Sequence, residues 1–377
     1  MIKLGDRMTI TRRTLLASIA SAAAVVRTNA FASTQDVQIG AIRWDAWYSK
    51  TDQSVSAQDN LSPKLYQPRA PVHCSVSNET VSCKGDQAVL DAEIRAAAQA
   101  GIAFWAFDWF PAGSSFRRAW TLYQSSSVNH LVKWCPIAGL ADLGSTSGSA
   151  KEMDEKVRDW LELMSFPTFF RARVRGVERP LFFIFYRAEE MLKYFGDLPS
   201  LRMRLDFFKK AAVQQGVDNP YFVLFNPALD LNLFSNSGVD ANSNYISDFR
   251  AQERGSFSEL DQQVRHYWDR MANIGTEIIP IAQVGWDKRP RLDRPVPWDR
   301  ADHKANRNLY YEMATPAEFT EHMRAAIGFV RRNANSCVSR TVLVYSWDEC
   351  DEGGCIMPTV GDPGGSYLRA VSRALDR

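Results

Sequence analysis

The sequence predicts a single α/β domain folded as a (β/α)8 barrel of the TIM type. Eight short apolar runs alternate with helix-like segments along the chain, and no two runs are joined by an evident two-residue hairpin turn. Alternating strands and helices of this kind build parallel βαβ units, and eight of them match a closed barrel. An open, doubly wound sheet is the competing fold. No Gly-x-Gly-x-x-Gly sequence follows the first strand to favour a dinucleotide-binding protein.

Length and composition fit this fold. The 377 residues are 45% hydrophobic and 23% charged, which is ordinary for a globular protein, and a barrel would occupy most of the chain. The formal net charge of +2 gives no reason to expect a nucleic-acid partner. The 11 tryptophans and 12 tyrosines are a mild indication of sugar binding, although hydrophobic cores use the same residues. The sequence leaves the oligomeric state open.

The first 32 residues are expected to be an export signal. Arg12-Arg13 precedes an apolar, alanine-rich segment at 15–26, and Ala30-Phe31-Ala32 supplies a small-x-small cleavage sequence. This order predicts a twin-arginine (Tat) signal, whose substrates usually cross the membrane already folded. An ordinary Sec signal or an uncleaved anchor is the alternative, but the apolar segment is too short for a stable span. We therefore expect a barrel domain over 33–377, periplasmic or secreted, with no membrane partner after signal removal.

The six cysteines of the mature chain suggest disulfides, because their number is even and the protein is expected to be exported. Cys74 and Cys83 lie close together in a polar loop and are the first expected pair. Cys350 and Cys355 could close the loop around an acidic cluster. No Cys-x-x-Cys or His-x-x-His spacing occurs, so neither a zinc site nor any other metal or cofactor is expected.

The predicted strands are short apolar runs rich in β-branched and aromatic residues. The last, Thr341–Tyr345, is apolar throughout, which is typical of a strand buried on both faces. The sixth rests on its place in the order more than on its composition. A long polar loop between the first strand and about Asp86 is expected to form an active-site wall. The eight runs lie at 37–44, 102–107, 132–140, 181–186, 221–225, 239–246, 277–284 and 341–345.

The predicted helices carry apolar residues at helical spacing. Gly101 is placed to end the first helix, and Thr315-Pro316 is placed to begin the sixth, with proline in its first turn. The segments are 87–100, 115–131, 152–170, 188–215 with a break near 197–200, 257–274, 316–333 and 365–375.

Acidic and aromatic residues stand side by side at four predicted strand ends. In a barrel these ends meet at one face, where the catalytic residues of such barrels lie. Aromatic faces and carboxylates suit a sugar better than a phosphate, which favours lysine, glycine-rich loops or helix N-termini. Any single pair could instead cap a loop, but four together favour a carbohydrate site. The residues expected to line it are Trp44, Asp45, Asp108, Trp109, Tyr186, Asn226, Trp286, Asp287, Arg289, Trp347 and Asp348.

Glu349 and Glu352 are predicted to be the catalytic pair. They follow the last strand in the sequence SWDECDEGG, where the chain must turn and both side chains can reach one bowl. Glycoside hydrolysis uses two carboxyl groups, one a proton donor with a raised pKa and the other a base or nucleophile. Asp348 and Asp351 are alternatives for either role. The acids could instead cap the turn or bind calcium.

A nucleophilic triad is a poorer interpretation of the sequence. There is no Gly-x-Ser-x-Gly elbow, and the five histidines are scattered along the chain. His322 falls in a predicted helix and His130 near the end of another, where a surface role is commoner than catalysis.

SWDECDEGG, with Pro358-Thr359 downstream, resembles the WNEW-x-EG signature of glycoside hydrolase family 99 and its wider relatives, the WbsX-like proteins of polysaccharide gene clusters. The segment GWDKRPR at 285–291 is similar to a GWD-x-RPR run in these relatives. Weaker agreement at the first two strand ends extends the resemblance over nearly the whole mature chain. The resemblance implies a (β/α)8 barrel and an endo-acting, retaining hydrolase of α-mannoside-type linkages.

By this resemblance Glu349 would deprotonate the 2-hydroxyl of the substrate, which attacks the anomeric carbon and gives a 1,2-anhydro sugar. Glu352 would protonate the leaving oxygen and then activate water. Two residues depart from the signature, because Asp348 replaces asparagine and Cys350 replaces an aromatic residue. An ionised Asp348 would add a negative charge and raise the pKa of its acidic neighbours.

Two rival functions follow from the same residues. WbsX-like proteins are also described as glycosyltransferases, although sugar nucleotides are scarce outside the cytoplasm. A non-catalytic carbohydrate-binding barrel is the second rival. Arg289 and Arg291 could meet an acidic sugar, but an arginine-rich loop is more often a solvated surface.

Overall fold

The computed structural model describes residues 36–48, 52–145, 150–225, 229–247, 253–296 and 307–376. The chain divides into two units, Met1–Asp36 and Val37–Arg377, and the account below concerns the second. The predicted export signal at 1–32 lies outside the described residues. Within the described ranges, no helix has both the length and the apolar character needed to cross a membrane.

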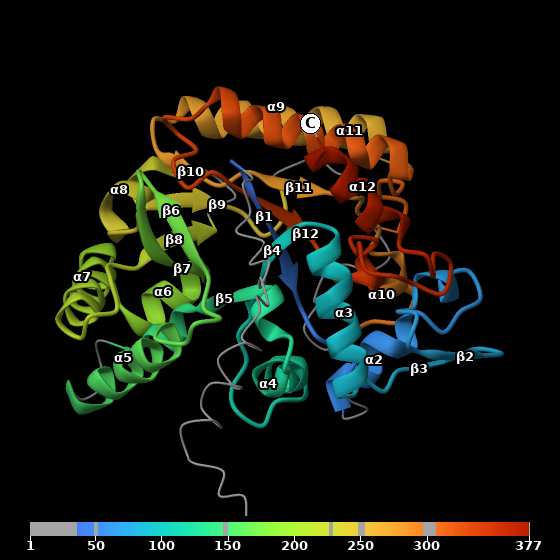
Figure 1. The fold of residues 1–377 in the computed structure, drawn as a ribbon, viewed down its shortest axis with the longest axis horizontal. Coiled ribbons are helices and arrows are strands. Elements are labelled where there is room, and N and C mark those ends of the chain that lie inside the picture. The colour runs from blue at the N-terminus through green and yellow to red at the C-terminus, as the bar shows by residue number, and fades with distance from the viewer. Residues whose placement is uncertain are drawn as a thin grey trace, which may run out of the picture. The chain divides into compact units, whose positions relative to one another are not determined.

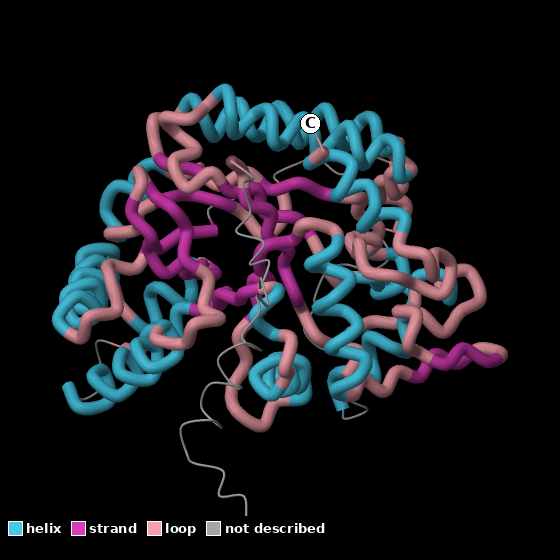
Figure 2. Tube along the Cα trace, in the orientation of Figure 1, coloured by secondary structure: helices cyan, strands magenta, loops and turns pink. Residues whose placement is uncertain are grey.

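Parallel strands form the centre of the second unit, with helices around them (Figure 1, Figure 2). Neighbouring strands in this sheet pair in parallel, as the alternating pattern predicts. The order is β10 (Glu277–Ile278), β9 (Ala241–Ser243), β8 (Tyr221–Phe225), β7 (Val177–Phe185), β5 (Lys133–Gly139), β4 (Ile102–Asp108), β1 (Gln38–Arg43), β12 (Thr341–Tyr345) and β11 (Ile281–Gln283).

β10 and β11 are two parts of one strand, and together they close the ring. β10 pairs with β9 at one end of the sheet, and β11 pairs with β12 at the other. Only Ile279 and Pro280 separate them. The ladder breaks here because proline has no N–H to donate, although the Pro280 carbonyl still accepts from Leu343 at 3.0 Å. Counted as one strand, they give the eight of the predicted (β/α)8 barrel, which is confirmed.

The helices of the barrel begin and end largely where the sequence predicts. α11 begins with Thr315 as its N-cap, and Glu318 completes a capping box. Gly101 follows α3 with φ +85°, a conformation that favours glycine. The helices are α2 (Asp52–Asn60), α3 (Gln87–Gln99), α4 (Arg118–Ser125), α5 (Ala150–Met164), α6 (Ala188–Tyr194), α7 (Leu198–Gln214), α8 (Leu231–Ser237), α9 (Phe257–Asn273), α10 (Arg289–Asp293), α11 (Pro316–Arg332) and α12 (Ser366–Leu375).

Two predicted helices were wrong in extent. The segment 115–131 is α4 between two short 3-10 turns. The helix predicted to reach Phe170 ends at Met164, and β6 (Arg171–Val174) then forms an antiparallel hairpin with β7. Arg175 and Gly176 make its turn with φ +49° and +85°, which is the two-residue turn that the sequence analysis overlooked.

The long segment before Asp86 carries structure of its own. It contains α2 and a small hairpin of β2 (Ser75–Ser77) and β3 (Thr80–Ser82). The disulfide Cys74–Cys83 joins the two ends of this hairpin. Cys350–Cys355 closes a loop directly after β12. Both expected cysteine pairs are therefore present in the structure, and Cys135 and Cys337 are free and buried.

Candidate active site

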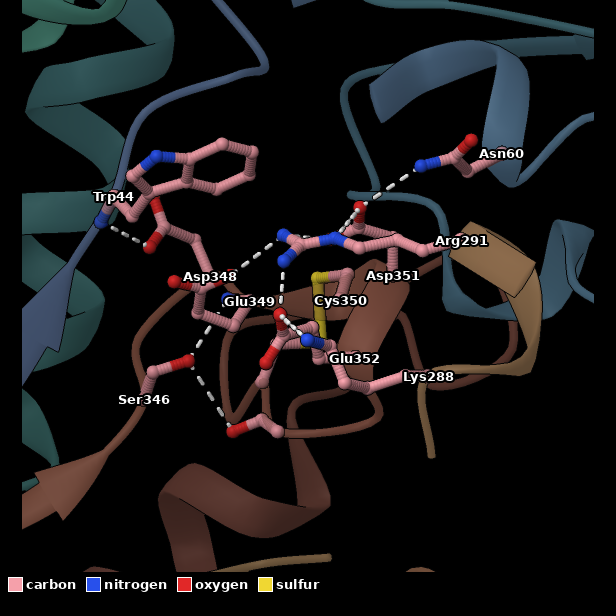
Figure 3. A network of polar contacts seen from close by, with 12 residues as sticks. Trp44, Asn60, Lys288, Arg291, Ser346, Asp348, Glu349, Cys350, Asp351 and Glu352 are labelled. Carbon is pink, nitrogen blue, oxygen red and sulfur yellow. Dashed lines mark hydrogen bonds and ion pairs between the residues drawn. A yellow bond between two sulfur atoms is a disulfide. The ribbon is translucent and has the colours of Figure 1, made fainter. Parts of the chain in front are cut away.

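Three acidic residues after β12 converge on one buried guanidinium (Figure 3). Arg291 donates to Asp351 through Nε at 2.7 Å and Nη2 at 3.1 Å, to Glu349 through Nη2 at 3.1 Å, and to Glu352 through Nη1. Arg291 comes from α10, after β11, and is only 5% exposed. We call Arg291, Glu349, Asp351 and Glu352 the Arg291 cluster. A planar guanidinium suits this arrangement, because its donors fan out toward several carboxylates at once.

The loop that carries these acids folds back on its own backbone. Ser346 Oγ accepts from the Glu349 N–H at 2.8 Å, and the Gly354 N–H donates to the Glu349 carbonyl at 3.1 Å. A Cβ at Gly354 would collide with the ring of Tyr345, so the turn needs glycine there. Together with the disulfide Cys350–Cys355, these contacts fix the backbone between the two glutamates.

Two tyrosine hydroxyls contact the two glutamates. Tyr245 Oη lies 2.7 Å from Glu349 Oε1 and 3.0 Å from Asp108 Oδ2, so it connects the ends of β4 and β12. Tyr345 donates to Glu352. Because a phenol has one proton, Tyr245 can donate to only one of its two carboxyl groups at a time.

One further cation lies at the edge of the Arg291 cluster, and burial raises the pKa of acids in and beside it. Lys288 Nζ lies 3.5 Å from Glu352 Oε1, and its side chain is 25% exposed. Burial raises the pKa of Glu349 well above its ordinary value; the charge of Glu352 raises it further, and Arg291 opposes the shift. Burial also raises the pKa of Asp108, to about 7. The site therefore contains carboxyl groups that can hold a proton near neutral pH, beside others in direct contact with cations.

A second buried guanidinium lies at the end of β1. Arg43 Nη2 is 2.8 Å from Glu93 Oε2 and 3.1 Å from Asp45 Oδ1. His73 Nδ1 lies 3.7 Å from the other oxygen of Glu93. Asp348 adjoins this group, since its side chain interacts with that of Asp45 and its Oδ1 accepts from the Trp44 N–H at 2.8 Å. We call Arg43, Asp45, His73, Glu93 and Asp348 the Arg43 cluster.

Asp287 links the loop after β11 to the loop after β12. Two arginines share its carboxylate, Arg289 at 2.7 and 2.8 Å and Arg69 through Nη2. Although burial alone would raise the pKa of Asp287, the Arg289 hydrogen bonds and the Arg69 charge lower it. Its backbone N–H donates to the Glu352 carbonyl at 2.6 Å. Asp287 and Arg289 thus act on the position of Glu352 through the backbone.

The structure places several of the predicted lining residues around the two clusters. The Trp44 ring lies 5.1 Å from the Arg291 guanidinium and stacks on Phe116. Trp286 and Tyr186 are half-buried at the ends of their strands. Asp45 and Asp348 lie in the Arg43 cluster, whereas Asp108 reaches Glu349 through Tyr245. Asn226 lies outside the described residues.

One predicted sugar platform, Trp347, was wrong, and a second, the partly exposed Trp109, packs among other aromatic rings of the protein. Trp347 is 0% exposed, packs against Trp105 and donates its indole N–H to Glu93. Trp109 stacks within an aromatic group formed by Trp120, Trp134 and Trp160, and Arg117 lies over its ring. Side chains alternate between the two faces of a strand. When the acid at a strand end faces the barrel interior, the tryptophan next to it therefore faces the surrounding helices.

The sequence analysis missed the groups that hold the acids in place. Arg291 was expected on a solvated surface, and Arg43, Tyr245 and Tyr345 were not singled out. Arg43 and Asp45 are two apart at a strand end and therefore face the same side, which could have suggested the pair. Tyr345 ends a buried strand, where a polar hydroxyl needs a partner.

His322 was expected on the surface but is 1% exposed. Its Nδ1 contacts Asp261, and its Nε2 accepts from the Gln283 N–H at 3.2 Å. These bonds fix the ring of His322, which belongs to α11, against α9 and β11, so its role is structural. Among the described residues, no group of three or more His, Cys, Asp or Glu side chains is arranged to hold a metal ion.

Comparisons with known proteins agree with the barrel fold. Residues 149–371, more than half of the chain, match the family model described as Glycosyltransferase WbsX. No curated protein matches the sequence. Two structures of the GH99 endo-α-mannosidase from Bacteroides thetaiotaomicron, one in complex with Bis-Tris propane, superpose with TM-scores of 0.54 and 0.53 at 14% identity. They cover 91% and 90% of this chain and 98% and 96% of their own. At this identity the likeness concerns the fold.

Proposed function

The chain belongs to the family described as Glycosyltransferase WbsX, and from its barrel fold and its two buried glutamates we propose that it is an exported glycoside hydrolase that cleaves an oligosaccharide or polysaccharide. The observation that carries the proposal is the Arg291 cluster, in which Glu349 and Glu352 are buried at the carboxyl end of the barrel and contact the same guanidinium. Two carboxyl groups at this end of a barrel are the usual apparatus of glycoside hydrolysis. The fold shared with an endo-α-mannosidase supports the same reaction class.

We assign Glu349 as the base and Glu352 as the acid. Glu349 takes the proton of the substrate's 2-hydroxyl, whose oxygen bonds to the anomeric carbon. The glycosidic bond breaks, and Glu352 gives its proton to the leaving oxygen. Water then opens the 1,2-anhydro sugar, losing a proton to Glu352 while Glu349 returns its proton to the 2-oxygen. The pKa of Glu349 is raised, chiefly by burial, so its carboxylate binds a proton more strongly than an ordinary glutamate, which supports a role in taking one from a hydroxyl group.

The groups around the pair serve this exchange. Tyr345 and Lys288 contact Glu352, and they compensate its negative charge after it has lost its proton. Arg291 lowers the repulsion between the two glutamates, which would otherwise oppose their burial together. Export is supported by the twin-arginine sequence and by two disulfides, which persist in oxidising compartments.

The test is reducing-sugar release by the mature protein from a panel of bacterial and fungal polysaccharides. Glu352→Gln is the inactive comparison, and Glu79→Gln, an exposed glutamate on another loop, is the matched control. Release that disappears in Glu352→Gln but persists in Glu79→Gln supports the hydrolase. Equal release by the wild type and Glu352→Gln would overturn the assignment.

A glycosyltransferase is the second candidate, favoured by the description of the family. It predicts consumption of a sugar nucleotide when an acceptor saccharide is present, with no release from polysaccharide alone. A non-catalytic binding barrel predicts neither product. In that case Glu349→Gln would bind the polysaccharide with unchanged affinity, and neither the wild type nor the variant would hydrolyse it.

A further inference from the structure

The Arg43 cluster contains more carboxyl groups than cations. Asp45, Glu93 and Asp348 are all buried, and among the described residues Arg43 is the one permanent cation that contacts them. His73 lies beside Glu93 and is the nearest group that could add a second positive charge. Even with that charge, one negative charge would stay uncompensated in a buried site, which is strongly unfavourable. At least one of the three carboxyl groups is therefore expected to be neutral.

The contacts show which of the three it is. Asp45 receives Nε and Nη2 of Arg43, and Glu93 receives Nη2 of Arg43 and the indole N–H of Trp347. In the described part of the chain, no ion pair includes Asp348, and Arg43 acts on it only through its charge. Its Oδ1 accepts from the Trp44 N–H, and its Oδ2 is buried with no donor to accept from.

The carboxyl group of Asp348 adjoins a second carboxyl group, that of Asp45. The side chains of Asp348 and Asp45 interact directly. Two ionised carboxylates would repel at this contact, whereas one proton between them converts it into a hydrogen bond. Since Arg43 already compensates Asp45, the proton belongs on Asp348.

We propose that Asp348 is a neutral carboxylic acid whose Oδ2–H donates to Asp45, and that it holds the loop carrying Glu349 without placing a charge beside it. Asp348 connects this loop to the end of β1 twice, through the Trp44 N–H and through its carbonyl, which accepts from the Trp47 indole at 2.8 Å. It is a positioning residue for Glu349. The charged or titratable groups around it are Arg43, Asp45 and Tyr48 from the end of β1, Glu93 from α3, and Glu349 from its own loop.

The electrostatic environment agrees with this state. Burial raises the pKa of Asp348 well above its ordinary value, the charge of Asp45 raises it further, and Arg43 opposes the shift. A neutral Asp348 also limits the effect on its neighbour, because a second negative charge would raise the pKa of Glu349 further. The inference on protonation stands without the proposed hydrolysis, and only its effect on activity rests on that function.

The first experiment is infrared difference spectroscopy at neutral pH between the wild type and Asp348→Asn. The proposal predicts a carbonyl-stretch band of a protonated carboxylic acid in the wild type that is lost in the variant. Asp261→Asn is the matched control, because hydrogen bonds and charges from His322 and Arg265 lower the pKa of Asp261 despite its partial burial. If Asp348→Asn loses a carboxylate band instead, the proposal is overturned. The amide reproduces both hydrogen bonds, so a variant that does not fold also overturns it.

The second experiment compares thermal unfolding midpoints across pH. An acid whose pKa is higher in the folded state binds more protons when folded, so its contribution to stability is lost as the pH rises. We expect the midpoint of Asp348→Asn to gain several degrees over the wild type between about pH 4 and about pH 7. A difference that stays constant or falls across this range would contradict a neutral Asp348.

The third experiment applies once a substrate is known, and it tests the effect on Glu349. The acidic limb of the kcat/KM profile should coincide in the wild type and Asp348→Asn, because the charge at this position is unchanged. If Asp348 were ionised, the variant would lose a negative charge next to Glu349, and its acidic limb would move to lower pH. Coincident limbs support the proposal and a shifted limb refutes it. The first two experiments decide the proposal even if no hydrolysis is found.

Discussion

The Arg291 and Arg43 clusters are similar in composition but differ in their surroundings. Each buries a guanidinium among carboxyl groups at the carboxyl end of the barrel. The acids of the Arg291 cluster also meet tyrosine hydroxyls and the partly exposed Lys288. Those of the Arg43 cluster are closed off by the indoles of Trp47 and Trp347. Burial of charge therefore does not by itself indicate a catalytic group. What distinguishes the Arg291 cluster is that its acids contact tyrosine hydroxyls and a partly exposed cation.

The largest expected effect tests that distinction directly. Glu349→Gln and Glu352→Gln should each lower kcat/KM by at least ~10³-fold, because each removes a proton acceptor or donor. Circular dichroism and the unfolding midpoint should stay close to wild type. A variant that retained more than about a tenth of the activity would remove its residue from the proposed chemistry.

Arg43→Met should act on stability instead. It leaves Asp45 and Glu93 buried without their cation, which costs about 3–5 kcal/mol in the free energy of unfolding. Urea denaturation measures this loss, and kcat/KM of the folded fraction should change far less than in the glutamate variants. If Arg43→Met lost its activity while its stability was unchanged, the Arg43 cluster would have the catalytic role that is proposed for the Arg291 cluster.

Removal of each of the two disulfides should likewise affect stability and activity differently. Replacing Cys74 and Cys83 by serine should lower the free energy of unfolding by about 2–3 kcal/mol, through the added freedom of the unfolded chain, with little effect on kcat/KM. Replacing Cys350 and Cys355 should cost about 2 kcal/mol and should also reduce activity, because that disulfide fixes the loop between Glu349 and Glu352. Equal activities of the two double variants would contradict this division.

The smallest expected effect concerns Tyr245→Phe. Its hydroxyl lowers the pKa of both Glu349 and Asp108. Without it both values rise further, so the base is protonated up to a higher pH and the acidic limb of the kcat/KM profile moves upward. We expect a loss of about tenfold at neutral pH, equivalent to about 1.4 kcal/mol. A limb that did not move would mean that Tyr245 is not coupled to the titrating group.

The barrel was predictable because its signals are local. Most strands contain an apolar run, whereas the sixth, β9, was placed by its position in the order. Thr315 and Gly101 mark helix ends through their own backbone geometry. The β6–β7 hairpin was overlooked because its turn signal, Arg175-Gly176, is short and lies in the stretch between the predicted helix at 152–170 and the predicted strand at 181–186.

Of the candidate site, only the acidic residues could be predicted from the sequence. Glu349 and Glu352 follow a strand whose end must lie at the barrel face, so their place follows from the fold. Arg291 is 58 residues from Glu349 in the sequence, and nothing local indicates that the ring brings the two together. The same holds for Tyr245, which follows a strand of only three residues. The groups that set proton affinities come from distant loops, and only closure of the ring reveals them.

The pairing of β1 with β12 has a consequence for how the protein is made. Trp44 and Asp348 are 304 residues apart in the sequence, yet their hydrogen bond joins the first strand end to the loop that carries the glutamates. Contacts between such distant residues form late in folding, because a large loop must close before they form. A ribosome-bound chain that lacks its last strand can build most of the helical layer but not the site. We therefore expect the candidate site to form only after the last strand has been synthesised and has paired with β1.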